Sequence, residues 1–319
     1  MNLSRCLYVF ALSALATTAA LAAKEPVKLD TGTGVLFGTI ETPASKPPYP
    51  VVLIIAGSGP TDRDGNSAIL KGHNDSLKMI ADGLASRGIA SLRYDKRGIA
   101  ASAAAGPKEA DLRFDMLVDD AVKWCEFLRQ DPRFKGIVIA GHSEGSLIGM
   151  IAARKFGADG NVSIAGAGIP ASQILLKQLR PSTPPALMKQ VEEIIKGLEE
   201  GHTTETEPPV LLAALFRPSV QPYLISWFKY DPAKEIAKLK IPTLIVQGTT
   251  DIQVSVDDAK ALSAADPSAK LVIIDGMNHV LKEVPADRQK QVASYSDPAL
   301  PVVPKLLDEI AALVAKASK

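Results

Sequence analysis

The stretch Ile137-Val138-Ile139-Ala140-Gly141-His142-Ser143-Glu144-Gly145 joins a short apolar run to a Gly-x-Ser-x-Gly motif. The apolar run predicts a buried strand, and the residues from Ser146 to Phe156, which end before a glycine, predict a helix. A strand that turns sharply into a helix holds its turn residue in a strained conformation, and flanking glycines let the neighbouring elements approach closely. The stretch therefore predicts that Ser143 projects from the end of a sheet strand, as a nucleophile would.

On both sides of this stretch, short apolar runs alternate with amphipathic helical stretches. This alternation is typical of the α/β class, with a doubly wound, mainly parallel sheet and helices on both faces. A chain of 319 residues, 46% of them hydrophobic, is long enough to bury a large core. One expected helix follows Asp75 as its cap and stops at Gly88. The predicted strands are 34–41, 51–55, 89–93, 137–140, 162–165, 243–247 and 271–274.

The alternation breaks in the region from about residue 168 to residue 234. Proline-rich turns separate helix-like pieces there, such as 187–200, and the strand pattern resumes at Pro242. We therefore predict a helical cap insertion over one end of the sheet. Its glutamates would suit either a solvated helix face or a cationic substrate group. The predicted division is a signal peptide (1–22), an α/β core (23–167 and 235–319) and the cap insertion (168–234).

The first residues are typical of a secretory signal. Arg5 gives a basic start, an apolar run follows over 7–16, and Ala20-Leu21-Ala22 offers a small-residue cleavage site. The apolar run is shorter and richer in Ala and Thr than the roughly 20 strongly apolar residues of a membrane-spanning helix. We therefore predict a cleaved signal rather than a retained anchor, an exported protein that is periplasmic or secreted, and no stable membrane insertion after signal removal.

The charge, cysteine and histidine patterns argue against nucleic acid, metal ions and cofactors as partners. Loss of Arg5 with the signal would bring the 36 basic residues level with the 35 acidic ones, which argues against nucleic acid as a partner. Cys125 would be the one cysteine left in the chain, and its helical spacing from Phe114 and Leu128 predicts that it faces the core. The sequence has neither paired histidines at ligand spacing nor a Walker-type phosphate loop, so we predict no metal and no cofactor.

A serine nucleophile needs a base within reach and a carboxylate that orients the base. His279 follows the last predicted strand, on a loop where it can reach over the serine, and Asp251 follows the preceding strand at the same sheet edge. Asp275 is an alternative acid, although it stands only four residues before His279. The predicted catalytic residues are thus Ser143, Asp251 and His279. The other three histidines lie elsewhere. His142 is beside Ser143 and points away from it, His73 is in a loop near the first helix, and His202 is in the insertion.

Taken together, these motifs resemble the α/β-hydrolase superfamily, and within it the bacterial esterase and serine-aminopeptidase-like branch. The Gly-x-Ser-x-Gly motif, the strand-end Asp251 and the Gly-x-x-His run that ends at His279 match the family order of nucleophile, acid and base. The resemblance implies an oxyanion hole made by the N–H groups of Glu144 and of Ser58. Many relatives have His-Gly where this sequence has Ala56-Gly57.

The resemblance implies a serine hydrolase that cleaves carboxylic esters through an acyl-enzyme intermediate. Its substrate would be a small-molecule ester or a short peptide-like molecule. A serine aminopeptidase-like peptidase or a thioesterase would use the same residues. A catalytically silent binding protein on this fold is an alternative of another class, and the complete set of nucleophile, acid and base favours the enzyme.

Two charged loops have a structural and a functional interpretation. In the loop 61–66, Arg63 or Asp64 would shape an acyl pocket in one interpretation, whereas ion pairs staple a turn in the other, which we favour. The run 93–98 is similar to a structural strand-to-loop turn of the superfamily, and we interpret it in the same way.

Overall fold

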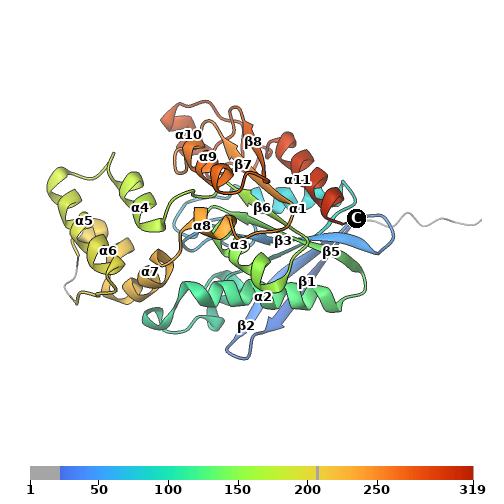
Figure 1. Cartoon of the computed structure of the whole chain (residues 1–319), viewed down its shortest axis with the longest axis horizontal. Helices are drawn as coiled ribbons and strands as arrows, with labels where there is room; N and C mark the ends of the chain where they lie inside the picture. Colours follow the sequence, from blue (N-terminus) through green and yellow to red (C-terminus); the bar gives the residue numbers. More distant parts are fainter. Residues whose placement is uncertain (1–21, 206–207, 319) are drawn as a thin grey trace, which may run out of the picture.

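The computed structural model describes residues 22–205 and 208–318 (Figure 1). The predicted signal peptide, 1–22, falls almost entirely outside the described residues. Within the described part of the chain, no helix combines the length and the apolar character needed to cross a membrane.

A single mainly parallel sheet organises the described chain (Figure 1). Its strand order is β1-β2-β4-β3-β5-β6-β7-β8. The β1–β2 and β2–β4 pairs are antiparallel, and all pairs from β4 to β8 are parallel. The predicted α/β class is confirmed. The strands are β1 (Ala23–Asp30), β2 (Val35–Thr42), β3 (Tyr49–Ile55), β4 (Ala90–Tyr94), β5 (Phe134–His142), β6 (Gly160–Ile164), β7 (Thr243–Gly248) and β8 (Lys270–Ile274).

The predicted strands all occur, with ends displaced by at most three residues, but β1 is an additional strand that the sequence pattern did not predict. Its residues are largely exposed and include Lys24, Glu25 and Pro26, so it lacks the apolar alternation that marks a half-buried strand. Backbone pairing along the whole of β2 holds this edge strand in place.

Helices cover both faces of the sheet (Figure 1). Helices α1 and α11 share a core with Val52 and Ile54 of β3, whereas α2, α3, α8 and α9 share the opposite core with Leu53 and Ile55. Alternate residues of β3 thus enter two cores, as expected for a strand buried on both faces. These helices are α1 (Ser76–Ala85), α2 (Phe114–Gln130), α3 (Glu144–Phe156), α8 (Pro232–Ile236), α9 (Val256–Ala265) and α11 (Pro304–Ala317); α10 (Arg288–Ser294) lies in the segment between β8 and α11.

Between β6 and β7, further helices build a third apolar cluster beyond one end of the sheet (Figure 1). Val191, Leu198 and Phe216 are among its fully buried members. The expected helix 187–200 corresponds to α5. The boundaries 168–234 of the cap insertion stay a prediction, and α8, which packs in the core, straddles the second of them. The helices of this region are α4 (Ala171–Leu179), α5 (Pro185–Glu199), α6 (Val210–Phe216) and α7 (Gln221–Phe228).

The structure contradicts the expected role of Asp75 and confirms the expected burial of Cys125. Asp75 precedes α1, but its side chain does not cap the helix: its backbone is left-handed, with φ 52°, and its carboxylate accepts a hydrogen bond from Asn66 Nδ2 at 2.8 Å. The side chain therefore braces the preceding loop instead. Cys125 lies in the core as predicted, and burial raises the pKa of its thiol far above the ordinary value, which keeps the thiol protonated.

Candidate active site

Ser143 occupies the sharp turn between β5 and α3, with φ 55° and ψ −118°. This conformation is strained for a residue with a side chain, and such strain persists only where the surroundings enforce it. The flanking glycines have no room for a Cβ atom: one on Gly141 would lie 1.9 Å from the Gly145 carbonyl oxygen, and one on Gly145 would lie 2.4 Å from that of Ile55. The local structure is the strand-to-helix elbow that the sequence predicts.

Two backbone segments with available N–H groups meet near Ser143. Glu144 is the first residue of α3, so its N–H has no acceptor within the helix. The loop after β3 packs against the elbow, because a Cβ atom on Gly57 would lie 3.2 Å from Ser143 Cβ. Among the described residues, the N–H of the next residue, Ser58, has no acceptor. Both N–H groups are therefore available to an anion, and their role as oxyanion donors stays a prediction.

The predicted acid and base are in direct contact. His279 Nδ1 and Asp251 Oδ2 are 2.8 Å apart, and the side chains are 6% and 0% exposed. Because a carboxylate only accepts, His279 Nδ1 carries the proton, which leaves Nε2 free to accept a proton. Asp251 Oδ1 also accepts the N–H groups of Gln253 and Val254 at 2.7 and 3.0 Å. Burial raises the pKa of Asp251, but His279 and these N–H groups outweigh it, so the pKa lies below its ordinary value.

The structure separates the alternative residues from this pair. Asp275 lies at the surface, where it accepts a hydrogen bond from Thr249 Oγ1 at 2.8 Å. The side chain of His202 is 75% exposed beyond the end of α5, and His73 lines a cavity beside the loop after β3. The structure therefore places Asp251, and not Asp275, against the predicted base. The catalytic roles of Ser143, Asp251 and His279 stay predictions.

His142 also belongs to this site, whereas the sequence suggested only that it points away from the serine. Its Nε2 donates to the backbone carbonyl oxygen of His279 at 2.8 Å, and the two rings lie 4.8 Å apart. Burial and the neighbouring His279 lower the pKa of His142 to about 3. His142 is thus a neutral support for the loop that carries the predicted base.

Sequence reasoning missed a buried polar network beneath the elbow. Lys96 Nζ donates to the Gly57 carbonyl oxygen at 2.5 Å and to Glu144 Oε2 at 2.8 Å, and Tyr223 of α7 donates its hydroxyl to Glu144 Oε1 at 2.5 Å. Lys96 and Glu144 are 4% and 6% exposed. Burial, followed by the Glu144 charge, raises the pKa of Tyr223, so its hydroxyl stays protonated. The position of Lys96 just after a strand, at the edge that carries the nucleophile, was the available clue.

Ion pairs staple both charged loops, in agreement with the interpretation favoured from the sequence. Arg63 and Asp64 each turn toward the sheet and bind a residue of the 93–98 run. The pairs are Arg63–Asp95 at 2.7 Å, Asp64–Arg93 at 2.7 Å and, between the 93–98 run and α2, Arg97–Asp120 at 2.5 Å.

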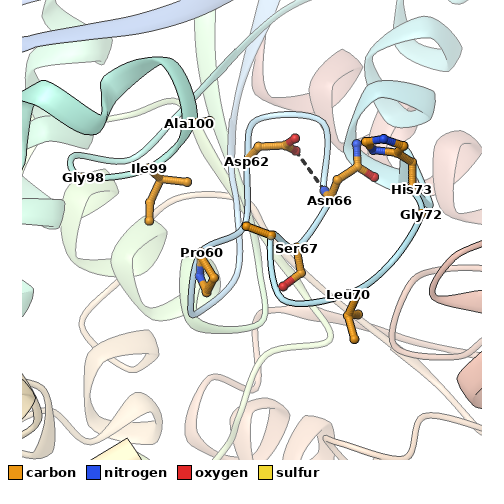
Figure 2. A pocket seen from close by; sticks show the side chains of 11 residues that line it. Pro60, Asp62, Asn66, Ser67, Leu70, Gly72, His73, Gly98, Ile99 and Ala100 are labelled. Carbon is orange, nitrogen blue, oxygen red and sulfur yellow. Dashed lines mark hydrogen bonds between the residues drawn. The ribbon is translucent and has the colours of Figure 1, made fainter. Parts of the chain in front are cut away.

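A cavity of about 380 Å³ opens beside the predicted oxyanion loop (Figure 2). It lies between the loop after β3, from Pro60 onward, and the loop after β4. Pro60 stands two residues beyond Ser58, so the cavity begins where that loop leaves the elbow. Figure 2 shows the backbone N–H of Asn66 bonded to Asp62, which fixes the polar side of the cavity. The lining residues are Pro60, Asp62, Asn66, Ser67, Ala68, Leu70, Gly72, His73, Gly98, Ile99 and Ala100.

Potential metal ligands do not gather in the described part of the chain. No group of three or more His, Cys, Asp or Glu side chains there is arranged to hold a metal ion. The polar groups near Ser143 instead form the acid–base pair and the network around Lys96 described above.

The chain has the fold of the α/β hydrolases, and in sequence it is similar to a bacterial esterase. The relative is Esterase EstD of Thermotoga maritima, 29% identical over 265 residues, which are 80% of this chain and 61% of that protein. The chain thus matches less than two thirds of that relative's length. Residues 70–207 match the model of the family described as Serine aminopeptidase, S33.

Solved structures of esterases share the fold. Est1E from Butyrivibrio proteoclasticus aligns with a TM-score of 0.59 and 18% identity, over 91% of this chain and 99% of its own. A thermophilic esterase from Thermogutta terrifontis aligns with a TM-score of 0.55 and 16% identity, over 92% of this chain and 100% of its own. At these identities the likeness concerns the fold, and the chemistry has to be argued from the site.

Proposed function

We propose that this chain is a carboxylic ester hydrolase that acts on small-molecule esters through an acyl-enzyme intermediate. The observation that carries the proposal is the buried hydrogen bond of 2.8 Å between His279 Nδ1 and Asp251 Oδ2, in a fold that strains Ser143 at its elbow. The similarity to Esterase EstD supports an ester over a peptide or thioester substrate.

The proposed reaction has two halves that use the same groups. In the first, His279 Nε2 takes the proton of Ser143 Oγ as this oxygen attacks the ester carbonyl carbon. The carbonyl π electrons move to the oxygen, and the N–H groups of Ser58 and Glu144 hold the resulting oxyanion. Collapse of this intermediate breaks the bond to the alcohol oxygen, which leaves with the proton from His279, and the acyl group stays on Ser143.

In the second half, water replaces the alcohol. His279 Nε2 takes a proton from the water as its oxygen attacks the acyl carbon, and a second oxyanion forms. Its collapse breaks the bond to Ser143 Oγ, which recovers its proton from His279, and the carboxylic acid leaves. Asp251 stays ionised throughout and stabilises the imidazolium form of His279.

The cavity of about 380 Å³ is our candidate for the site of one substrate arm. Its apolar lining includes Pro60, Leu70 and Ile99, and it adjoins the loop that carries Ser58 (Figure 2). Pockets of this size are typical for small ligands, and an apolar lining favours an alkyl or aryl group over a charged one.

The proposal also includes export: the chain is periplasmic or secreted, and residues 1–22 are removed as a signal peptide. The basic start at Arg5, the apolar run and the Ala20-Leu21-Ala22 site support it. Because β1 begins at Ala23, cleavage after Ala22 would leave every described strand complete. Fractionation of the producing cells and N-terminal sequencing test the proposal: a chain that keeps its first residues in the cytoplasm would contradict it.

An activity screen tests the proposed reaction. The purified protein is assayed with p-nitrophenyl esters from acetate to decanoate and with aminoacyl-p-nitroanilides, with Ser143→Ala as the control. We expect turnover of esters and loss of that turnover in the variant. Turnover confined to the anilides would favour an aminopeptidase, and absence of both turnover and labelling by a fluorophosphonate would favour a catalytically silent protein.

A further inference from the structure

A single ammonium group joins the two segments predicted to hold the oxyanion. Lys96, in the loop after β4, is 4% exposed, and its Nζ donates both to the Gly57 carbonyl oxygen (2.5 Å) and to Glu144 Oε2 (2.8 Å). Gly57 belongs to the loop after β3, and Glu144 begins α3. Lys96 thus bridges the loop of one predicted donor, Ser58, and the residue that supplies the other.

The geometry of the peptide group gives this bridge a consequence. The Gly57 carbonyl and the Ser58 N–H are the two ends of one peptide plane, and in a trans peptide they point in opposite directions. A bond that fixes the carbonyl oxygen therefore also fixes the direction of the N–H. Because the donor is charged, this bond is stronger than a neutral one, and it polarises the amide so that the Ser58 N–H becomes a better donor.

The carboxylate that receives Lys96 is itself held from a second side. Tyr223 of α7 donates to Glu144 Oε1 at 2.5 Å. Helix α7 is anchored on α2: the rings of Trp227 and Phe114 stack with centroids 5.9 Å apart, and Ser226 Oγ accepts the Phe114 N–H at 2.8 Å. The Glu144 carboxylate that binds Lys96 is therefore rigid. Such a fixed partner lets Lys96 set the orientation of a peptide group.

The energetics favour a positioning role over a stabilising one. Burial of two charges costs several kcal/mol per ion before their attraction repays it, so a buried ion pair is weak evidence for stability. Glu144 also neutralises the ammonium, which limits the net charge that the pair places near Ser143. What the pair retains is the fixed geometry of the Gly57 carbonyl.

We propose that Lys96 is a positioning residue for ester hydrolysis, because it holds the Gly57–Ser58 peptide with its N–H directed at the oxyanion. The inference rests on the proposed function, since it requires the Ser58 N–H to be an oxyanion donor. It adds Lys96 to the residues on which the rate of acyl transfer depends, although Lys96 touches no reacting atom.

The test compares Lys96→Met/Glu144→Gln with Glu144→Gln. The double variant removes both charges of the pair and leaves no buried charge unpaired, whereas Glu144→Gln alone leaves the buried ammonium without its carboxylate. Loss of a whole oxyanion donor costs about 100- to 1000-fold in kcat, and a donor that is present but misdirected is expected to cost about 10- to 100-fold. KM for p-nitrophenyl butyrate should change by less than about threefold, because the ground-state carbonyl is not yet an oxyanion.

A second readout separates positioning from folding. A trifluoromethyl ketone forms a tetrahedral oxyanion with a serine nucleophile, so its Ki in the double variant should rise by about the factor by which kcat/KM falls. The melting temperature of the double variant should not fall below that of Glu144→Gln, which keeps an unpaired buried ammonium. Lys96→Arg keeps a cation and should bind the ketone more tightly than Lys96→Met. The matched control is Lys123→Met: Lys123 Nζ also donates to a carbonyl oxygen at 2.5 Å, that of Thr31, away from the site. This control should keep wild-type kcat and Ki.

Three results would overturn the inference. The first is equal kcat in Lys96→Met/Glu144→Gln and Glu144→Gln, and the second is a fall in kcat that merely follows the fraction of folded protein with Ki unchanged. The third is a change of kcat and Ki in Lys123→Met equal to that in Lys96→Met/Glu144→Gln. Failure of the proposed function looks different: the wild-type protein would then hydrolyse no ester, or Ser143→Ala would keep its activity.

Discussion

Replacement of His142 by asparagine should make the fold less sensitive to mild acid. His142 is 8% exposed, and burial together with the neighbouring His279 lowers its pKa to about 3. In the unfolded chain its pKa returns to the ordinary value of about 6.5. Between these two values the unfolded state binds more protons than the folded state, so the free energy of unfolding rises with pH through this window. The contribution of His142 to the free energy of unfolding is complete above its pKa in the unfolded chain. This contribution declines as the pH falls toward its pKa in the folded protein.

The size of the effect follows from the two pKa values. At pH 5 the unfolded histidine is almost fully protonated and the folded one is not, which lowers the free energy of unfolding by about 2 kcal/mol relative to pH 7. Asparagine has no proton to gain, yet its Nδ2 can still donate to the His279 carbonyl oxygen that His142 Nε2 contacts at 2.8 Å. The variant should therefore lose about 2 kcal/mol less than the wild type between pH 7 and pH 5.

Urea unfolding, followed by the fluorescence of Trp124 and Trp227 at both pH values, measures this difference. His202→Asn is the matched control, because it removes one histidine whose side chain is 75% exposed. Equal losses of stability in His142→Asn and in the wild type would show that His142 does not titrate differently in the folded and unfolded states.

Three further outcomes follow from the same structure. Asp251→Asn should lower kcat by up to about 10⁴-fold, because an amide can hold His279 in the wrong tautomer; steady-state kinetics with a circular dichroism check measures this, and a loss below about tenfold would contradict the assignment. Ile99→Trp should narrow the cavity and raise KM for long p-nitrophenyl esters but not for the acetate, and a uniform change would place the acyl group elsewhere. Gly145→Ala should destabilise the protein by more than about 3 kcal/mol in urea, because its Cβ atom would lie 2.4 Å from the Ile55 carbonyl oxygen; wild-type stability would contradict the packing.

The elbow and the central strands were predictable because their signals are local. A buried parallel strand is an apolar run, and the glycines that flank Ser143 are required by the close backbone approach seen at Gly141 and Gly145. Asp251 and His279 could be placed for a related reason: each follows a strand of one parallel sheet, and such strand ends meet at one edge. Sequence position alone left Asp275 open as the acid, whereas the structure shows that Asp251 contacts His279.

The features that the sequence did not predict depend on contacts between distant segments, for which the sequence carries no periodic signal. Lys96 lies 39 residues from Gly57 and 48 from Glu144, and its run of charged residues is typical of a structural turn. Strand β1 is an exposed edge strand that is defined by backbone pairing and not by an apolar pattern. Asp75 shows a third limit, because a residue of the type that caps helices can bind an earlier loop instead.

Identification of the residue that a fluorophosphonate modifies is the most direct test that Ser143 is the nucleophile. The nucleophilic oxygen attacks the phosphorus of the probe, the P–F bond breaks and fluoride leaves. A phosphonyl group stays on the nucleophile, so peptide mapping by mass spectrometry locates that oxygen. We expect one adduct on the peptide that contains Ser143, its absence in Ser143→Ala, and slower labelling in Asp251→Asn. A stoichiometric adduct on another residue, or unchanged labelling of Ser143→Ala, would show that Ser143 is not the nucleophile.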